Sequence, residues 1–306
     1  MTTVETTPQG ESGNGIMLVI HAGAGGRRAD ASPERTARVE NDLARALDAG
    51  YAVLDRGGSA EDAVVAAIHV MEDAVEFNAG HGAALTSEGK VSMDACLMTG
   101  DGEVGSAAGL TTASHPIDVA RAIKERTKHV MFALPGEDLL RQWHIGVECP
   151  EAFVTEDRRA SLERAQREGD VWEKHGTIGA VARDAGGHLA AATSTGGITN
   201  QMPGRVGDTP LPGCGNYAAD GVAAVSGTGV GEAFVRTVAA HQLADRMRFA
   251  GQTASAASQA VLDDIAAHRG DGGVIVVPAN GAGVVAYNSE MMNYGYATPS
   301  GRRVHG

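Results

Sequence analysis

The sequence predicts a mixed α+β protein in which antiparallel sheets pack against layers of helices. Strand-like runs come in consecutive pairs along the chain, and so do helical patterns, whereas a parallel α/β fold would alternate the two. The 306-residue chain also contains 42 glycines. This is well above the usual share of roughly 7%. They are dispersed without a three-residue period, so we expect many tight turns and close backbone contacts.

Composition excludes several classes of protein. Hydrophobic residues make up 43% and charged residues 21%, as expected for a globular chain with a full core. The formal net charge of −13 opposes binding to nucleic acid phosphates. No apolar run approaches the roughly 20 residues that span a bilayer. The three cysteines are odd in number and far apart, which favours neither a disulfide framework nor a zinc site. We therefore expect a cytoplasmic protein without a membrane partner.

The first half begins with a buried strand and two capped helices. The apolar run IMLVIH (16–21) leads into a glycine turn, AGAGG. Ser32 then predicts a helix start and Gly57 its end. Ser59 caps the next helix, with Asp62 as its capping-box partner. A glycine loop is expected at 77–84, strands at 91–98 and 104–111, and helices at 117–126, 137–143 and 158–168.

Two segments stand apart from this pattern. Residues 1–15 (MTTVETTPQGESGNG) contain no Lys, Arg or apolar stretch, so they are expected to be a disordered leader rather than a secretory signal. The segment from about 156 to 176 is strongly charged and is expected to be an exposed, mobile connector. The rest of the chain, 16–306, is expected to form a single domain.

A hairpin follows the connector. The strand-like runs TIGAVARD and HLAAATST are separated by a turn at Gly186. If the turn centres there, residues whose numbers sum to 372 face each other, which places Thr177 opposite Thr195. Cross-strand partners lie about 5 Å apart at Cβ. Two hydroxyls therefore converge, although Thr is also common in strands for structural reasons. Beyond the hairpin we expect a loop at 196–215, strands at 222–226, 274–277 and 284–287, and helices at 231–247 and 254–268.

Two further motifs suggest a site for an amino acid. The loop MPGRVGDTPLP (202–212) holds Arg205 and Asp208, which could bind an α-carboxylate and an α-amino group, or could pair with each other. The segment SGTGVGE (226–232) predicts a strand, a glycine turn and a helix start, which could hold an oxyanion or a phosphate.

The missing element is a general base. No GxSxG motif is present and no histidine has a recognisable triad context. A threonine can supply its own base if it becomes a chain terminus, because an α-amine has a pKa of about 8 and can accept the hydroxyl proton. This requires cleavage between Gly176 and Thr177.

These motifs carry a family resemblance. GTIGAVARDAGGHLAAATSTGGITNQMPGRVGDTPLPGCG (176–215), SGTGVGE, IHAGAGG, MEDAVEFNAGHGAALTSEG and SMDACLM resemble the plant-type L-asparaginase/isoaspartyl peptidase family of threonine N-terminal nucleophile hydrolases. The resemblance extends from Ile16 to about Pro299. It implies an αββα four-layer sandwich and a self-activating amidohydrolase. Its substrates would be β-aspartyl (isoaspartyl) dipeptides and L-asparagine, its product L-aspartate, and its catalysis would need no cofactor.

The resemblance also implies roles for individual residues. Self-cleavage at Gly176–Thr177 would give an α subunit, 1–176, and a β subunit, 177–306, assembled as a homodimer of αβ units. The implied catalytic residues are Thr177, Thr195, Thr228 and Gly229, and the implied substrate-binding residues are Arg205, Asp208, Thr228, Gly229 and Asn78. A structural sodium ion would be bound through the backbone carbonyls of Met71, Glu72, Ala74, Phe77, Ala79 and His81.

The chain departs from the family pattern at several places. Ala22 replaces a common glycine, Ala74-Val75 replaces a frequent Cys-Pro, and SEMMNYGYA (289–297) is unusual. His175, just before the cleavage pair, is interpreted as a solvated connector residue. Three alternatives stay open: cleavage of a sugar–asparagine amide as in glycosylasparaginases, a nucleotide-binding oxidoreductase built on 227–231, and an uncleaved binding protein that uses the Arg205/Asp208 pair.

Overall fold

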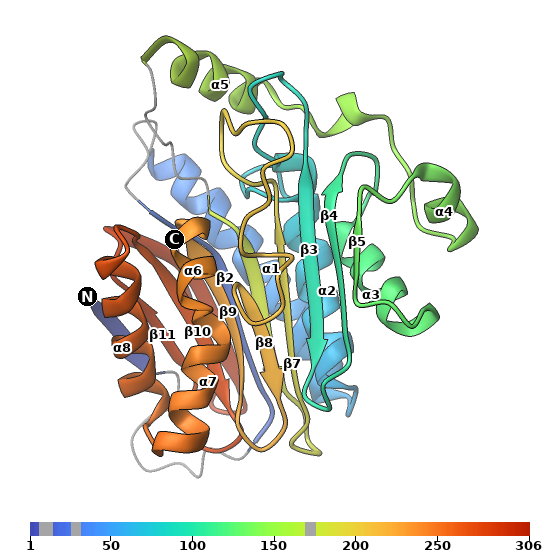
Figure 1. Ribbon diagram of the computed structural model, residues 1–306. Helices are drawn as coiled ribbons and strands as arrows, with labels where there is room; N and C mark the ends of the chain where they lie inside the picture. The colour runs from blue at the N-terminus through green and yellow to red at the C-terminus, as the bar shows by residue number, and fades with distance from the viewer. Residues whose placement is uncertain (6–14, 26–31, 169–175) are drawn as a thin grey trace.

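The computed structural model describes residues 1–5, 15–25, 32–168 and 176–306 of the chain, and its two sheets lie face to face between layers of helices (Figure 1). The larger sheet has eight strands in the order β13-β12-β2-β6-β7-β3-β4-β5, and the smaller has five in the order β1-β11-β10-β9-β8. The predicted α+β class and its four-layer arrangement are confirmed.

The strands of the larger sheet are mostly antiparallel, the exception being the parallel pair β4–β5. Their bounds are β2 Met17–Gly25, β3 Met93–Thr99, β4 Val104–Leu110, β5 Met131–Ala133, β6 Ile178–Arg183, β7 Leu189–Thr195, β12 Met291–Thr298 and β13 Gly301–His305. Those of the smaller sheet are β1 Thr2–Glu5, β8 Asn216–Ala219, β9 Ala223–Gly229, β10 Gly272–Pro278 and β11 Val284–Tyr287.

Helices cover the outer face of each sheet. Helices α1 to α3 pack on the larger sheet, and α6 to α8 pack on the smaller one (Figure 1). A third apolar cluster lies between the sheets and includes Val19, Val181 and Ile275. The helices are α1 Pro33–Asp55, α2 Ala60–Asp73, α3 Pro116–Arg126, α4 Glu137–Gln142, α5 Glu156–Glu168, α6 Gly231–Thr237, α7 Ala239–Ala250 and α8 Ala254–Ala267, with 3-10 turns η1 Gly80–Gly82 and η2 Pro150–Phe153.

The helix starts follow the predicted caps. The side chain of Ser32 accepts the N–H of Arg35, and Ser59 accepts the N–H of Asp62 at 3.0 Å. Ser59 also donates to the Asp62 carboxylate at 2.8 Å, so serine and aspartate bind each other at this start. One helix prediction was wrong: 231–247 is two helices, because Val238 adopts a left-handed conformation with φ of 49°.

The structure corrects the expectation of a disordered leader. Thr2–Glu5 forms β1 and pairs antiparallel with β11 at the edge of the smaller sheet. Its pairing partner lies some 280 positions away along the chain, so no local pattern could indicate it. Residues 6–14 lie outside the described residues.

The charged segment after residue 155 is also more ordered than predicted. Glu156–Glu168 forms α5, and Arg158 on this helix is buried and donates to the carbonyl of Gly82 at 2.5 Å. A buried guanidinium needs such an acceptor, and the contact holds the helix on the glycine loop. The rest of the predicted connector up to His175 lies outside the described residues.

The sheets contain several strands that the sequence did not predict. Strands β5, β8, β12 and β13 were not predicted, and the unusual segment 289–297 forms most of β12, which pairs with β2.

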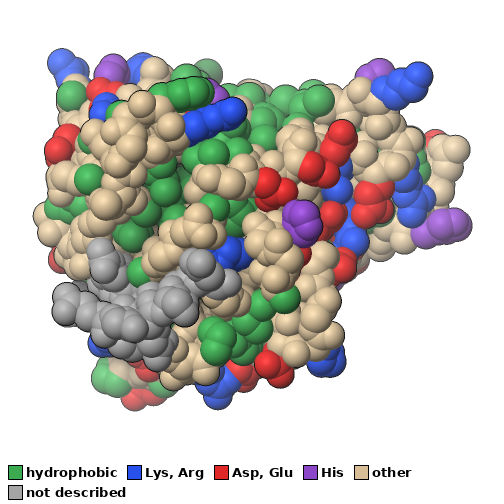
Figure 2. All heavy atoms as spheres, turned by 90° about the horizontal axis from the view of Figure 1, so that it is seen from below, with side chains coloured by type: hydrophobic (Ala, Val, Ile, Leu, Met, Phe, Trp, Pro, Cys, Tyr) green, Lys and Arg blue, Asp and Glu red, His purple; other side chains and the backbone are tan. Residues whose placement is uncertain are grey.

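On the face shown in Figure 2, acidic and basic side chains lie next to one another rather than in separate fields. No helix in the described ranges is both long and apolar enough to cross a bilayer.

Candidate active site

Thr177 and Thr195 meet where the hairpin of β6 and β7 opens. Ile178 pairs with Ser194, so the register predicted from the turn is confirmed. The Thr177 hydroxyl donates to Oγ1 of Thr195 at 3.0 Å, and this oxygen also accepts the N–H of Gly197 at 3.1 Å. Both threonines are buried, with exposed fractions of 9% and 3%. Thr195 therefore holds the Thr177 hydroxyl in a defined orientation.

The predicted cleavage bond lies directly on β2. A Cβ added to Gly176 would lie 1.9 Å from the Cα of Gly23, and one added to Gly23 would lie 2.3 Å from the Cα of Gly176. Gly23 also has φ of +106°, which strongly favours glycine. The neighbouring Ala22 pairs with Ile178 and belongs to the core, so this departure from the family pattern fits the local packing.

A buried histidine links the two sheets beneath Thr177. His21 Nε2 lies 2.9 Å from Oγ of Ser226 on β9, and Ser226 lies 2.8 Å from Oγ1 of Thr193 on β7. Burial lowers the pKa of His21 to about 3, although a hydrogen bond with the Thr177 backbone opposes this shift. His21 is therefore neutral at ordinary pH and acts as a hydrogen-bonding link between β2 and β9.

Arg205 pairs with a glutamate that the sequence analysis did not assign. Its Nε and Nη2 donate to the two carboxylate oxygens of Glu232 on α6, each at 3.1 Å. Burial would raise the pKa of Glu232, but the hydrogen bonds from Arg205 hold it below its usual value. The guanidinium thus binds a carboxylate through two parallel bonds, which is the geometry expected for an α-carboxylate.

Asp208 lies in the same loop but has an unpaired carboxylate oxygen. Asp208 is 6% exposed, and in the described part of the chain its Oδ2 has no hydrogen-bond partner. Burial raises its pKa to about 6. A Cβ on Gly215 would lie 2.6 Å from Oδ2, so glycine leaves the space beside that oxygen free. A buried acceptor without a donor is costly and is well suited to bind a cation.

Strand β9 ends at the predicted oxyanion residues. Thr228 is buried, and within the described residues its hydroxyl also has no hydrogen-bond partner. Gly229 has φ of +147°, and a Cβ there would lie 2.2 Å from the carbonyl oxygen of Asp271. Strand β9 pairs antiparallel with both β8 and β10, which contradicts the parallel β-α-β unit that a dinucleotide-binding oxidoreductase requires.

These segments converge at the upper end of the sheets in Figure 1, where β6 begins, β7 and β9 end and the 196–215 loop crosses. The model of one protein family, described as asparaginase, matches residues 14–305. This chain belongs to the asparaginase family.

Curated relatives cover almost the same length. An isoaspartyl peptidase of Salmonella typhimurium is 40% identical over 301 residues, covering 93% of this chain and 96% of the relative. An isoaspartyl peptidase of Escherichia coli is 38% identical, covering 92% and 93%. An isoaspartyl peptidase/L-asparaginase of Danio rerio is also 38% identical, covering 92% of each chain.

In this asparaginase-family chain, the Asn78 amide bonds to protein backbone at both ends. Its Nδ2 donates to the carbonyl of Gly197 at 2.6 Å, and its Oδ1 accepts the N–H of Ala84 at 2.7 Å. Asn78 thus ties the glycine loop to the residues just after Thr195. These contacts hold the two loops together next to the predicted site. The substrate-binding role of Asn78 stays a prediction.

The predicted sodium loop wraps around the end of α2. The structure describes no group of three or more His, Cys, Asp or Glu side chains that could hold a metal, so an ion here would depend on backbone oxygens. A Cβ on Gly80 would lie 2.2 Å from the Glu72 carbonyl oxygen, so glycine lets the loop close on this oxygen. The carbonyls of Ala74 and Ala79 each accept one backbone N–H and keep a second lone pair. Such neutral oxygens suit a hard cation.

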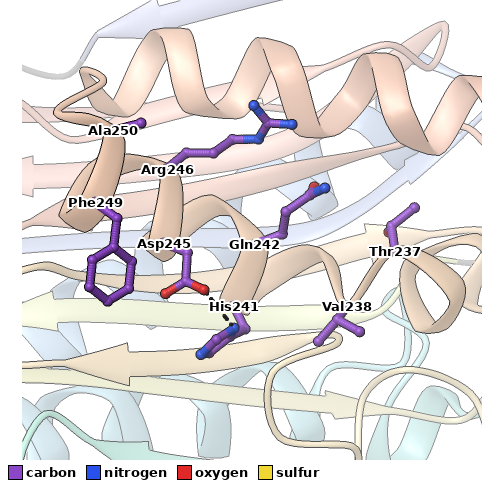
Figure 3. A pocket seen from close by; sticks show the side chains of 8 residues that line it. All are labelled: Thr237, Val238, His241, Gln242, Asp245, Arg246, Phe249 and Ala250. Carbon is purple, nitrogen blue, oxygen red and sulfur yellow. Dashed lines mark ion pairs between the residues drawn. The ribbon is translucent and has the colours of Figure 1, made fainter.

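A surface hollow of about 510 Å³ lies elsewhere, over the start and length of α7 (Figure 3). Its only hydroxyl side chain, Thr237, donates to carbonyls within α6. His241 and Asp245 form an ion pair with each other at 3.4 Å. None of the predicted site residues lines this hollow.

Sequence reasoning missed Glu232 and His21 as parts of the site. Both stand inside motifs that the sequence made conspicuous, SGTGVGE and IHAGAGG. Their partners lie 27 and 205 positions away, so only the fold shows the contacts.

Proposed function

We propose that this chain is a self-activating amidohydrolase that hydrolyses β-aspartyl (isoaspartyl) peptides and L-asparagine and releases L-aspartate. The observation that carries the proposal is the 3.0 Å contact between the hydroxyls of Thr177 and Thr195, at the residue that follows the predicted cleavage bond. The names of the relatives, isoaspartyl peptidase and L-asparaginase, support the same substrates.

Activation begins in the intact chain. Oγ1 of Thr177 attacks the carbonyl carbon of Gly176, and the peptide bond becomes an ester as the acyl group moves from nitrogen to oxygen. Water then hydrolyses this ester, which leaves a carboxylate on Gly176 and a free amine and hydroxyl on Thr177. The products are the predicted subunits, 1–176 and 177–306.

In the mature enzyme the Thr177 amine accepts the proton of its own hydroxyl. The hydroxyl oxygen attacks the side-chain carbonyl of the substrate, and Thr228 and Gly229 stabilise the resulting oxyanion. Removing one such donor typically costs about 3–4 kcal/mol of barrier stabilisation. Ammonia or an amino acid leaves, and water then releases aspartate from the acyl-enzyme.

Substrate recognition uses the two charged side chains of the 202–212 loop. Arg205 binds the α-carboxylate, which takes the place of the Glu232 carboxylate on the guanidinium. Asp208 accepts a hydrogen bond from the α-ammonium group at Oδ2, which has no partner among the described residues. These two contacts fix the position of the substrate's α-carbon, so that its side-chain carbonyl lies next to the Thr177 hydroxyl.

Three further properties belong to the same proposal. The loop 71–81 binds a structural sodium ion through its carbonyls, which would fix the loop that Asn78 ties to the site. Catalysis itself needs no cofactor. The enzyme is a homodimer of αβ units in the cytoplasm, in keeping with three cysteines that are all unpaired, at Cys96, Cys149 and Cys214.

The substrate assignment is tested by offering β-aspartyl dipeptides, L-asparagine and glycosylasparagine to the same preparation and measuring aspartate release. We expect turnover of the first two. Turnover of glycosylasparagine alone would assign the site to sugar–asparagine amides, and tight ligand binding without turnover would make the chain a binding protein.

A further inference from the structure

We propose that Ser106 is a positioning residue that fixes the turn 208–215 to the larger sheet and so sets where Asp208 lies relative to the catalytic threonines. This inference rests on the proposed function, in which Asp208 binds the α-ammonium group of the substrate. Ser106 lies on β4 and takes no part in the cleavage and hydrolysis steps described above.

The turn 208–215 closes on the backbone of Asp208. The Asp208 carbonyl oxygen accepts the N–H groups of Leu211 and Gly215, each at 3.1 Å. Pro210 lies within this turn, and its ring fixes its own φ angle. The turn therefore behaves as one compact unit, and a contact that fixes Pro210 also fixes the backbone from which the Asp208 side chain extends.

Ser106 provides such a contact. Its hydroxyl donates to the carbonyl oxygen of Pro210, and the serine is fully buried. Pro210 is buried as well, and among the described residues no backbone N–H donates to its carbonyl. A buried carbonyl without a donor is costly, so the serine hydroxyl stabilises the turn in this place.

The pairing of the larger sheet connects Ser106 to the catalytic strand. Ser106 lies directly opposite Cys96 on β3, and Cys96 lies directly opposite Thr193 on β7. These three residues form one row across the sheet, and Thr195 follows Thr193 two positions further along β7. The hydrogen-bonded strands therefore set the distance between Ser106 and the threonine that orients the Thr177 hydroxyl.

The end of the turn is held on the same row. Asn216, which follows the turn at the start of β8, donates through Nδ2 to Oγ1 of Thr193 at 2.9 Å and to the Cys96 carbonyl at 3.5 Å. Asn216 and Thr193 are both fully buried. The turn thus has two anchors on the sheet, and Ser106 is the one that lies closer to Asp208 in the chain.

Arg205 is held in a different way. Its guanidinium bonds to Glu232 on α6, and neither of these bonds involves Ser106 or Pro210. Loss of the Ser106 hydroxyl should therefore displace Asp208 and leave Arg205 in place. The enzyme would lose affinity for the α-ammonium group of a substrate and keep its affinity for the α-carboxylate.

The test replaces Ser106 by Ala and compares L-asparagine with succinamate, which keeps the α-carboxylate and the amide but lacks the α-amino group. Self-cleavage, kcat and KM are measured for both substrates. Inhibition by L-aspartate and by succinate gives the same comparison for binding. Ser258→Ala is the matched control, because Ser258 is equally buried on α8 and its hydroxyl has no hydrogen-bond partner among the described residues.

We expect S106A to complete cleavage at 176/177, because that step does not use Asp208. Its KM for L-asparagine should rise about fivefold, the factor that corresponds to one hydrogen bond of typical net strength. Its kcat should change less, and its KM for succinamate should stay unchanged. The S258A control should leave both KM values unchanged.

An unchanged KM for L-asparagine in S106A, or equal increases for L-asparagine and succinamate, would overturn the proposal. If S106A does not accumulate as folded protein, Ser106→Cys is measured instead. Its S–H group is a weaker donor of similar size, so the same selective increase is expected at a smaller magnitude.

Wild type reports on the proposed function separately. A wild-type protein that hydrolyses neither L-asparagine nor β-aspartyl dipeptides would contradict the proposed function and this inference together. Wild-type hydrolysis with the same KM values in S106A would contradict only the role of Ser106.

Discussion

The hydroxyl oxygens of Thr177 and Thr195 lie 3.0 Å apart, with Thr177 donating. Since Thr195 also accepts the N–H of Gly197, its own orientation is fixed by the backbone. The contact provides a defined direction for the Thr177 proton before any substrate is bound.

Thr195→Val removes this acceptor while keeping the shape of the side chain. We expect the fold to persist and both self-cleavage and turnover to slow by about tenfold or more, since one lost hydrogen bond of roughly 1.4 kcal/mol corresponds to that factor. Mass analysis over time and initial rates of aspartate release measure the two effects. Unchanged rates for both steps would remove Thr195 from the mechanism.

Gly23→Ala tests the backbone contact at the cleavage bond. The new Cβ would lie 2.3 Å from the Cα of Gly176, so we expect the precursor to remain largely uncut. Gly187→Ala is a matched control, because Gly187 also has positive φ, +82°, but nothing lies within 4 Å of its added Cβ. The control should lose about 1 kcal/mol of stability and cleave normally. Equal cleavage in both variants would show that the contact with Gly176 is irrelevant.

Glu232→Gln tests competition for the Arg205 guanidinium. The wild-type carboxylate holds both donors at 3.1 Å, so a substrate carboxylate must displace it. A neutral amide binds Arg205 less strongly, and we expect KM for L-asparagine to fall several-fold. Arg205→Lys should raise KM, because an ammonium lacks the planar pair of donors. A KM that rises in the glutamine variant would indicate that Glu232 holds Arg205 in place rather than competing with substrate.

The pH profile of kcat/KM tests the role of Asp208. The α-ammonium of the substrate needs an ionised carboxylate, and burial raises the pKa of Asp208 to about 6. A second group also titrates, because the Thr177 amine must be neutral to accept the hydroxyl proton. Activity falls as pH drops below the pKa of this amine, about 8 in model peptides. It should fall more steeply below about 6, where Asp208 becomes protonated.

Succinamate, which is asparagine without its α-amino group, is the control substrate for this profile. It should show the amine-dependent fall but no added steepness at lower pH. The same second step with succinamate would assign it to another group.

Local patterns predicted the hairpin because its turn at Gly186 and the alternation of its strands determine one register, which placed Thr177 beside Thr195. The helix starts at Ser32 and Ser59 were predictable because a capping side chain and the backbone N–H that it accepts lie only three residues apart. These features depend on chain neighbours, and the sequence contains that information directly.

The missed features depend on contacts between distant parts of the chain. The 202–212 loop left open that Arg205 and Asp208 pair with each other. The fold instead brings Glu232 to the arginine, and among the described residues Asp208 Oδ2 has no hydrogen-bond partner. Strand β1 was missed because its pairing partner is β11. The break at Val238 has no proline or glycine to indicate it, and the neighbouring sequence offers no physical reason for it.

The proposed mechanism depends most on whether the chain cuts itself before Thr177. Denaturing mass spectrometry and N-terminal sequencing of the purified protein test this directly. Self-cleavage by Thr177 should give two fragments, the second beginning Thr-Ile-Gly-Ala-Val, and Thr177→Ala should stay uncut. An intact chain with full aspartyl-amide hydrolysis would contradict it.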